Sequence, residues 1–136
     1  MSFLNGVSLF SSLTAEEKKS LEMFCQERSL SNGEILFNEG DEAQAMYIVK
    51  EGELEVSKGN SVLGIVKKDG LVGEMALFEE PLKRRMASVK SISSETEIIV
   101  LLYFSIKEME KKNPIIIEKI KNIITQRKEQ NKNRGL

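Results

Sequence analysis

The fold of this chain is indicated by two neighbouring stretches, Gly73-Glu74-Met75-Ala76-Leu77 and Arg85-Met86-Ala87-Ser88-Val89. A glycine has no Cβ, so the backbone at Gly73 can approach an anion closely. The residues that follow are expected to open a short helix, near residues 74–79, whose free N–H groups would point at that anion. Arg85 can donate two parallel hydrogen bonds to phosphate oxygens, and Glu74 can accept one from a ribose hydroxyl. The pattern therefore indicates a site for a sugar phosphate.

On either side of these stretches the sequence reads as short strands separated by turns. The strands are expected at residues 34–38, 45–50, 53–57, 61–66, 86–92 and 97–102. Glycine-containing turns separate them, among them Asn32-Gly33-Glu34, Glu39-Gly40-Asp41, Glu51-Gly52-Glu53, Lys58-Gly59-Asn60 and Asp69-Gly70. Many short strands at regular spacing favour a jelly-roll β-barrel, and Lys58-Gly59-Asn60 is typical of a hairpin connection.

A helix is expected before the strands. Thr14-Ala15-Glu16-Glu17 has the spacing of a capping box, in which Thr14 is the N-cap and Glu17 reaches back to it. Leu21, Phe24 and Cys25 would then share one apolar face of this helix. The pattern therefore predicts an N-terminal helix that packs against the barrel.

Helices are also expected after the last strand. Ser105-Ile106-Lys107-Glu108 has the spacing of a second capping box, and Asn113-Pro114 is a typical helix start. An apolar stripe follows, made of Ile116, Ile117, Ile120, Ile123 and Ile124. We interpret this stripe as core or as a dimer seam, and it is also the candidate for a ligand lid. After Thr125 the chain becomes polar and basic and is expected to fray.

Composition excludes several classes of protein. The 136 residues suffice for one domain with a core, 30% of them are charged, and the net charge of −1 gives no general attraction to nucleic acid. The single Cys25 excludes an intrachain disulfide, and we read no signal peptide and no membrane-length apolar run, so a cytoplasmic location is expected. Histidine is absent, which removes the commonest general base and metal ligand.

The first stretches resemble the phosphate-binding cassette of the cyclic-nucleotide-binding domain family. This family provides the sensor module of the catabolite activator protein and of the regulatory subunits of protein kinase A. The matching residues are Val72-Gly73-Glu74-Met75-Ala76-Leu77 and Arg84-Arg85-Met86-Ala87-Ser88-Val89. The order of turns and strands also matches, so the resemblance covers roughly residues 8–112.

The resemblance implies a mainly β fold with flanking helices. It is a jelly-roll β-barrel with an N-terminal helix, a short cassette helix and C-terminal helices. The barrel and its helical lead-in would occupy residues 1–112, and residues 113–136 would form a lid or dimerisation helix with a basic tail.

The resemblance also implies a ligand and the residues that bind it. The implied ligand is cyclic AMP or cyclic GMP, with no further cofactor and no metal. Glu74 would bind the ribose 2′-hydroxyl and Arg85 the phosphate, helped by Gly73 and by backbone N–H groups near Met75, Ala76 and Met86. In this family a Ser or Thr after the arginine favours guanine, and Met86 has no hydroxyl, so cyclic AMP is the expected ligand.

Three positions depart from the family pattern and keep alternatives open. Val72 replaces an aromatic residue, Arg84 replaces a proline, and Met86 stands where Ala, Ser or Thr is common. The register between Arg84 and Arg85 is therefore open. The chain is alternatively a degenerate member that acts as a ligand-independent protein-interaction module.

The simplest structural alternative is that Gly73 serves a tight turn and that Glu74 is an exposed acid at a helix N-terminus. Catalysis is disfavoured, since neither a metal-ligand cluster nor a nucleophile–base pair can be read from the sequence. Expected partners are the cyclic nucleotide and either a second copy of the chain or a separate effector protein. Neither a membrane nor nucleic acid is expected as a partner.

Overall fold

The computed structural model describes residues 2–73 and 84–133 of the chain. Its helices are η1 (Ser8–Phe10), α1 (Ala15–Glu22), α2 (Tyr103–Lys112) and α3 (Pro114–Asn133). Its strands are β1 (Cys25–Ser31), β2 (Ile35–Phe37), β3 (Ala45–Glu51), β4 (Leu54–Lys58), β5 (Ser61–Val66), β6 (Leu71–Val72), β7 (Ser88–Ser91) and β8 (Glu95–Leu102). The predicted short helix near residues 74–79 lies outside the described residues.

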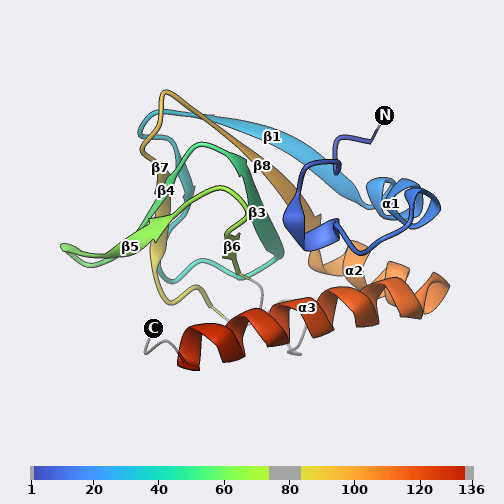
Figure 1. Cartoon of the computed structure of the whole chain (residues 1–136). Helices are drawn as coiled ribbons and strands as arrows, with labels where there is room; N and C mark the ends of the chain where they lie inside the picture. Colours follow the sequence, from blue (N-terminus) through green and yellow to red (C-terminus); the bar gives the residue numbers. More distant parts are fainter. Residues whose placement is uncertain (1, 74–83, 134–136) are drawn as a thin grey trace.

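The described strands form two antiparallel sheets, in the orders β1-β8-β3-β6 and β2-β7-β4-β5 (Figure 1). Except for β4 and β5, neighbours in each sheet come from distant parts of the sequence, as in a jelly roll, so the predicted fold class is confirmed. Gly59 and Asn60 connect β4 to β5, as the hairpin prediction required. All six predicted strands are present, and β1 and β6 are two strands that the sequence did not predict.

Strands β3 and β8 are buried on both faces of their sheet along most of their length. Successive side chains of a strand point to opposite sides of its sheet. In β3, Ala45, Tyr47 and Val49 belong to the core between the two sheets, whereas Met46 and Ile48 belong to a second core under the helices. Two-sided burial explains why β8 contains an uninterrupted apolar run at residues 98–101 rather than an alternating pattern.

The N-terminal helix is confirmed but is shorter than predicted. Thr14 and Glu17 form both hydrogen bonds of the capping box, and Leu21 is buried. The expected continuation through Phe24 and Cys25 is wrong, because α1 ends at Glu22 and Cys25 opens β1, opposite Leu101 of β8. The strand was not predicted because only two of its seven residues are buried. Pairing with β8, rather than local apolar periodicity, makes this segment a strand.

The second predicted capping box is wrong. The helix α2 begins at Tyr103, and its N-cap is Leu102, which forms no side-chain cap hydrogen bond. Strand β8 runs directly into the helix, and the Tyr103 N–H donates to the Gln44 carbonyl at 2.8 Å. This tertiary hydrogen bond fixes the junction, so Ser105 lies inside the first turn.

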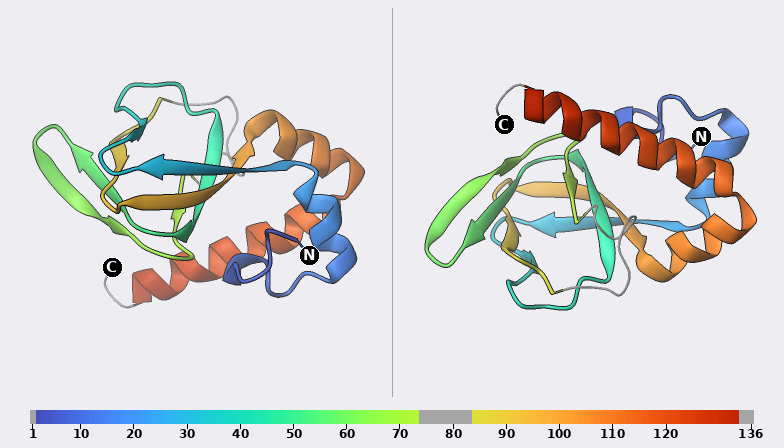
Figure 2. Two further views of the ribbon diagram at one scale, coloured as in Figure 1. Left: turned by 90° about the horizontal axis from the view of Figure 1, so that it is seen from above. Right: turned by 90° about the horizontal axis from the view of Figure 1, so that it is seen from below.

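Helix α3 begins at Pro114 as predicted and crosses the helical side of the molecule (Figure 2). Within its stripe Ile116, Ile117, Ile120 and Ile124 are buried with the residues of η1, α1 and α2, so the stripe is core. The polar segment after Thr125 was expected to fray, but it continues the helix to Asn133. No described helix is long and apolar enough to cross a membrane.

Candidate functional site

The backbone of Arg85 is held by the turn that follows β2. The Arg85 N–H donates to the Asp41 carbonyl at 2.7 Å, and the Gly40 N–H donates to the Arg85 carbonyl at 2.9 Å. The turn is itself closed, since the Asn38 N–H donates to the Asp41 carboxylate at 2.9 Å. Arg85 therefore starts from a fixed backbone position although it lies outside any regular strand.

The side chain of Arg85 points into the core between the sheets. Only 8% of the residue is exposed, whereas the neighbouring Arg84 is exposed. Its Nη2 donates to the Ala45 carbonyl at 2.7 Å. Its Nε is buried and has no hydrogen-bond partner among the described residues. A buried guanidinium with an unused N–H donor is a poor arrangement for stability alone and a suitable one for receiving an anion.

Two aromatic rings contact the guanidinium. Its Cζ lies 4.2 Å from the ring centroid of Phe37, at the end of β2, and 5.6 Å from that of Tyr47 in β3. The two centroids are 5.9 Å apart and the ring planes are tilted by 31°. Both rings lie within the range of cation–π attraction, and they come from opposite sheets.

Burial lowers the pKa of the Arg85 guanidinium, while the Tyr47 phenol and the Asp41 carboxylate act in the opposite direction. Arginine nevertheless stays protonated in proteins, because its ordinary pKa lies far above neutrality. The site therefore contains a buried positive charge whose hydration is reduced. An anionic ligand would compensate this cost.

Gly73 lies directly against Arg85. Its φ of +74° is in the left-handed region that favours glycine. A Cβ at this position would overlap Nη1 of Arg85 and would lie 2.9 Å from the Ala45 carbonyl oxygen. A tight turn would by itself explain the positive φ of Gly73. The lack of space for a Cβ beside Arg85 is a second reason why this residue is glycine.

Of the other predicted site residues, the structure describes Met86 but not Glu74, Met75 or Ala76. Met86 follows Arg85, and 75% of it is exposed. Glu74, Met75 and Ala76 lie outside the described residues, so their predicted roles stay predictions. Arg84 lies outside the named strands, in a loop held by an isolated β-bridge to Glu42. Its Nη1 donates to the Gly40 carbonyl at 3.1 Å.

Three residues of the site, Ala45, Phe37 and Tyr47, lie outside the cassette motif. Strand alternation would place Ala45 and Tyr47 on the same face, and both rings lie in predicted strands. What the sequence could not provide is the pairing that brings β2 and β3 to the same arginine. That proximity arises only when the two sheets face each other.

The C-terminal helix is fastened to the segment that leads to Gly73. Arg127 of α3 donates from Nη1 to the Asp69 carbonyl at 2.9 Å and from Nη2 to Ser8 Oγ at 2.7 Å. The Ser8 N–H donates to the Asp69 carboxylate at 2.9 Å, and Asp69 has a φ of +69°. We call Ser8, Asp69 and Arg127 the latch. Only Gly70 and the short strand β6 separate it from Gly73.

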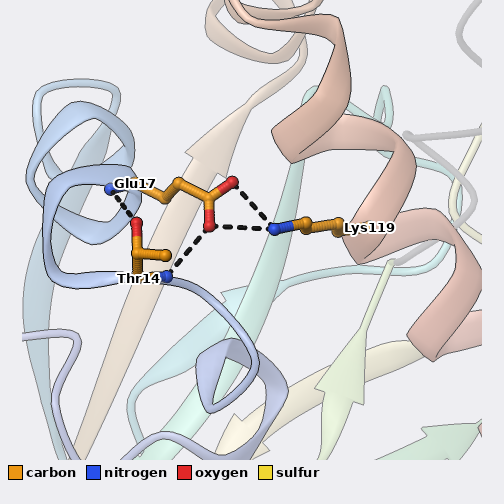
Figure 3. A network of polar contacts seen from close by, with 3 residues as sticks. All are labelled: Thr14, Glu17 and Lys119. Atoms are coloured by element: carbon orange, nitrogen blue, oxygen red, sulfur yellow. Dashed lines mark hydrogen bonds and ion pairs between the residues drawn. The ribbon is translucent and has the colours of Figure 1, made fainter.

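A second attachment joins α3 to α1. Lys119 Nζ lies 3.0 Å from both carboxylate oxygens of Glu17, the same residue that closes the capping box with Thr14 (Figure 3). Helix α3 is therefore attached to α1 through Lys119, in its first half, and to the barrel through Arg127, in its second half.

Among the described residues no cluster of three or more His, Cys, Asp or Glu side chains could hold a metal ion.

Comparison with known proteins identifies the kind of domain to which this site belongs. Residues 27–113 match the family model of the cyclic nucleotide-binding domain. A Rhodopseudomonas palustris protein named as a potassium channel protein is 34% identical over 135 residues, which are 97% of this chain and 32% of that protein. A cAMP-dependent protein kinase regulatory subunit of Hypocrea atroviridis is 31% identical over 67% of this chain and 19% of its own length. The chain thus spans a third or less of these relatives.

Solved structures give the same family. The C-linker/CNBHD of zELK channels, crystallised in the presence of cAMP, has a TM-score of 0.77 and 28% identity, over 93% of this chain and 64% of that one. The catabolite activator protein of Thermus thermophilus has a TM-score of 0.73 over 93% of this chain and 60% of its own. At 24% identity that second likeness concerns the fold.

Proposed function

The chain belongs to the cyclic nucleotide-binding domain family, and from this premise we propose that it binds a cyclic purine nucleotide at Arg85 and passes its ligand state on through the C-terminal helices. Domains of this family are regulatory sensor modules. We therefore propose a non-catalytic sensor, with the nucleotide as its ligand rather than its substrate.

One observation carries the proposal: the buried Arg85 guanidinium, whose Nε has no hydrogen-bond partner among the described residues. Burying a charged donor without a partner costs free energy, and a cyclic phosphate supplies both the charge and the acceptor oxygens. Gly73 allows the backbone to come close to the same guanidinium, as a site for a small anion requires. The proposed roles of Glu74 for the ribose and of Met75 and Ala76 for the phosphate rest on the cassette motif.

Isothermal titration calorimetry with cyclic AMP and cyclic GMP tests the binding proposal. Arg85→Ala removes the charge-assisted hydrogen bonds to the phosphate, which are worth about 1.5–3 kcal/mol, so affinity should fall about tenfold or more. Arg84→Ala is the matched control, because Arg84 is the adjacent arginine but is exposed. It should keep the parental affinity.

Two results would contradict the binding proposal. Loss of affinity in Arg84→Ala with normal binding in Arg85→Ala would place the phosphate at the other arginine. Absence of heat for both nucleotides with the parent chain would favour the alternative, a degenerate member that acts as a ligand-independent interaction module.

For the base we propose that cyclic AMP is preferred to cyclic GMP. The residue after Arg85 is Met86, which is largely exposed and has no hydroxyl to bond the exocyclic amine of guanine. Parallel titrations compare the two affinities directly. Tighter binding of cyclic GMP would overturn this part of the proposal.

For the output we propose that α3 senses the state of the site through the latch. Arg127 holds the Asp69 carbonyl, and the chain continues from Asp69 through β6 to Gly73. A ligand changes this arrangement only as far as it prefers one state of it. We propose that the signal passes from α3 to a separate effector protein, to a neighbouring domain or to a second copy of the chain.

Hydrogen exchange with and without nucleotide tests the proposed output. Amide protection in residues 106–130 should change at saturating ligand, and β1, which lies away from Gly73 in the sheet order, provides the internal reference. Unchanged protection of α2 and α3 would show that these helices do not report binding. The isoleucine stripe would then serve only as core.

A further inference from the structure

We propose that Phe37 and Tyr47 are positioning residues for Arg85, an aromatic pair that holds the guanidinium ready to receive a phosphate. The inference rests on the proposed function, because it assigns a role at the same site. It goes beyond that function by naming two residues outside the cassette motif. Neither residue needs to touch the nucleotide, since each acts through Arg85.

The two rings belong to paired strands. Phe37 lies opposite Val89 in the β2–β7 pair, and Tyr47 lies between Val72 of β6 and Val100 of β8. Both residues are therefore anchored in sheets rather than in mobile loops, which is the usual requirement for a precisely held site. The ring centroids lie 4.2 and 5.6 Å from Cζ of Arg85, so the guanidinium is in contact range of both.

Aromatic rings suit this task better than a carboxylate would. A ring attracts a cation through its negatively charged face and can stack on the flat guanidinium. A carboxylate would attract it as well, but it would occupy the N–H donors and neutralise the charge that a phosphate needs. The aromatic pair restrains Arg85 and leaves its Nε without a protein partner among the described residues.

The rings add to the restraint that one short hydrogen bond provides. Nη2 of Arg85 donates to the Ala45 carbonyl at 2.7 Å, and a long side chain held at one end can still rotate about that bond. Two ring contacts from opposite sheets remove this freedom. The entropic cost of ordering the guanidinium then falls on folding and not on nucleotide binding. Binding is tighter as a result.

A double-mutant cycle tests whether the rings act through Arg85. Phe37→Leu and Tyr47→Leu should each weaken cyclic AMP binding about threefold to thirtyfold, the range of one cation–π contact in a desolvated site. In the Arg85→Ala background the same changes should alter affinity less than about twofold, because no guanidinium remains to be positioned. Equal losses in both backgrounds would mean that the rings only support the fold, and would overturn the inference.

Conservative variants and stability measurements complete the cycle. Tyr47→Phe keeps the ring and removes only the hydroxyl, which also interacts with Arg85, so it should retain more of the parental affinity than Tyr47→Leu does. Thermal unfolding of every variant identifies any loss of folded protein. If one leucine variant does not fold, the other ring still provides a complete cycle. Equal losses of affinity in Tyr47→Phe and Tyr47→Leu would assign the effect to the hydroxyl and contradict a role for this ring.

A measurement without nucleotide separates this inference from the proposed function. A proton above an aromatic ring experiences a ring-current shift, so the Arg85 Hε signal should be displaced upfield in the ligand-free chain. It can be assigned by its absence in Arg85→Lys, and Phe37→Leu should move it toward the ordinary position.

The two failures then look different. A displaced signal in a chain that binds neither nucleotide would defeat the proposed function and would still show that the rings hold the guanidinium. An ordinary Hε position in a chain that binds nucleotide through Arg85 would defeat the aromatic pair and leave the proposed function intact.

Discussion

Among single residues, the site depends on which groups surround Arg85. The guanidinium is buried, contacts two rings, and lies against a glycine that has no room for a Cβ. The rings and the glycine are uncharged, and the Ala45 carbonyl accepts a hydrogen bond from Nη2. The N–H of Nε has no hydrogen-bond partner among the described residues. This chemistry distinguishes Arg85 from Arg84, which has the same side chain in an exposed loop position.

Gly73→Ala should reduce both stability and nucleotide affinity. An alanine at a φ of +74° costs about 1–2 kcal/mol, and its Cβ would displace Nη1 of Arg85. Gly33→Ala is the matched control, because Gly33 has a φ of +83° and a Cβ added there would meet nothing within 4 Å. Chemical denaturation should show the cost of the backbone angle in both variants and a larger loss of stability in Gly73→Ala, where the Cβ also crowds Arg85 and the Ala45 carbonyl. Titration calorimetry should show a loss of affinity only in Gly73→Ala, and equal affinities would contradict the close approach.

Cys25 should be inert to thiol reagents in the folded chain. Burial, and to a lesser degree the Glu22 carboxylate, raises the pKa of its thiol to about 12, so almost no thiolate exists at about pH 8. An Ellman assay should show slow modification of the native chain and immediate modification in denaturant. Rapid modification without denaturant would show that the end of β1 opens readily.

Among the elements, the start of α1 shows how one side chain can serve two contacts. Glu17 closes the capping box by accepting from the Thr14 N–H at 2.9 Å, and the same carboxylate pairs with Lys119 of α3 (Figure 3). The local motif could be read from four consecutive residues. The ion pair joins residues that are far apart in the sequence, and it makes the cap part of the contact between two helices.

The stability that Glu17 contributes should depend on pH. The hydrogen bond from the Thr14 backbone, followed by the one from Lys119, lowers the pKa of Glu17 below its ordinary value of 4.5. A lowered pKa in the folded state means that the contribution is complete above the unfolded value and is lost as the pH falls through the folded one. Urea unfolding of the parent and of Glu17→Gln should therefore differ near neutral pH and converge in acid. A constant difference across this range would contradict the assignment.

Across the whole molecule, α3 connects parts of the chain that the barrel alone would leave separate. Its apolar stripe forms the helical core with η1, α1 and α2, and its polar contacts reach Glu17 at one end and Asp69 at the other. Figure 2 shows this helix running from the other helices alongside the barrel toward the C-terminus. A movement of α3 would therefore disturb both the N-terminal helices and the segment before Gly73.

Ile120→Ala should destabilise the chain by about 2–5 kcal/mol, because Ile120 is fully buried and its removal leaves a cavity in the helical core. Ile115→Ala is the matched control, since Ile115 lies in the same helix but is 64% exposed. The control should change the free energy of unfolding by less than about 0.5 kcal/mol. Similar losses in both variants would indicate that the exposed isoleucine is covered in solution.

Arg127→Ala should loosen the latch without unfolding the barrel. Loss of both donors frees the Asp69 carbonyl and Ser8 Oγ, so hydrogen exchange should increase in residues 66–73 and in the C-terminal half of α3. Arg127→Lys keeps the charge but not the two-donor fork, so it should restore the protection only in part. Exchange in the β4–β5 hairpin should not change. A uniform increase over all strands would indicate general destabilisation rather than release of the latch.

Much of this structure could be predicted from local sequence patterns. The six predicted strands, the Thr14 cap, the β4–β5 hairpin and the start of α3 each follow from a few consecutive residues, because turn chemistry and capping act over short distances. Of the three departures in the helices, two arose where a tertiary contact overrides the local signal. Pairing with β8 made residues 25–31 a strand, and a hydrogen bond to Gln44 moved the start of α2 to Tyr103.

The barrel, the family and the candidate arginine pair all follow from the amino-acid sequence, since glycine positions, strand spacing and one motif suffice to identify them. Three further features depend on tertiary packing: which arginine is buried, which rings contact it and how α3 is fastened to the approach to Gly73. The physical reason is that burial and cation–π contact are properties of side chains brought together from separate strands. No local pattern records which strands will meet, because that choice is made when the two sheets and the helices pack as a whole.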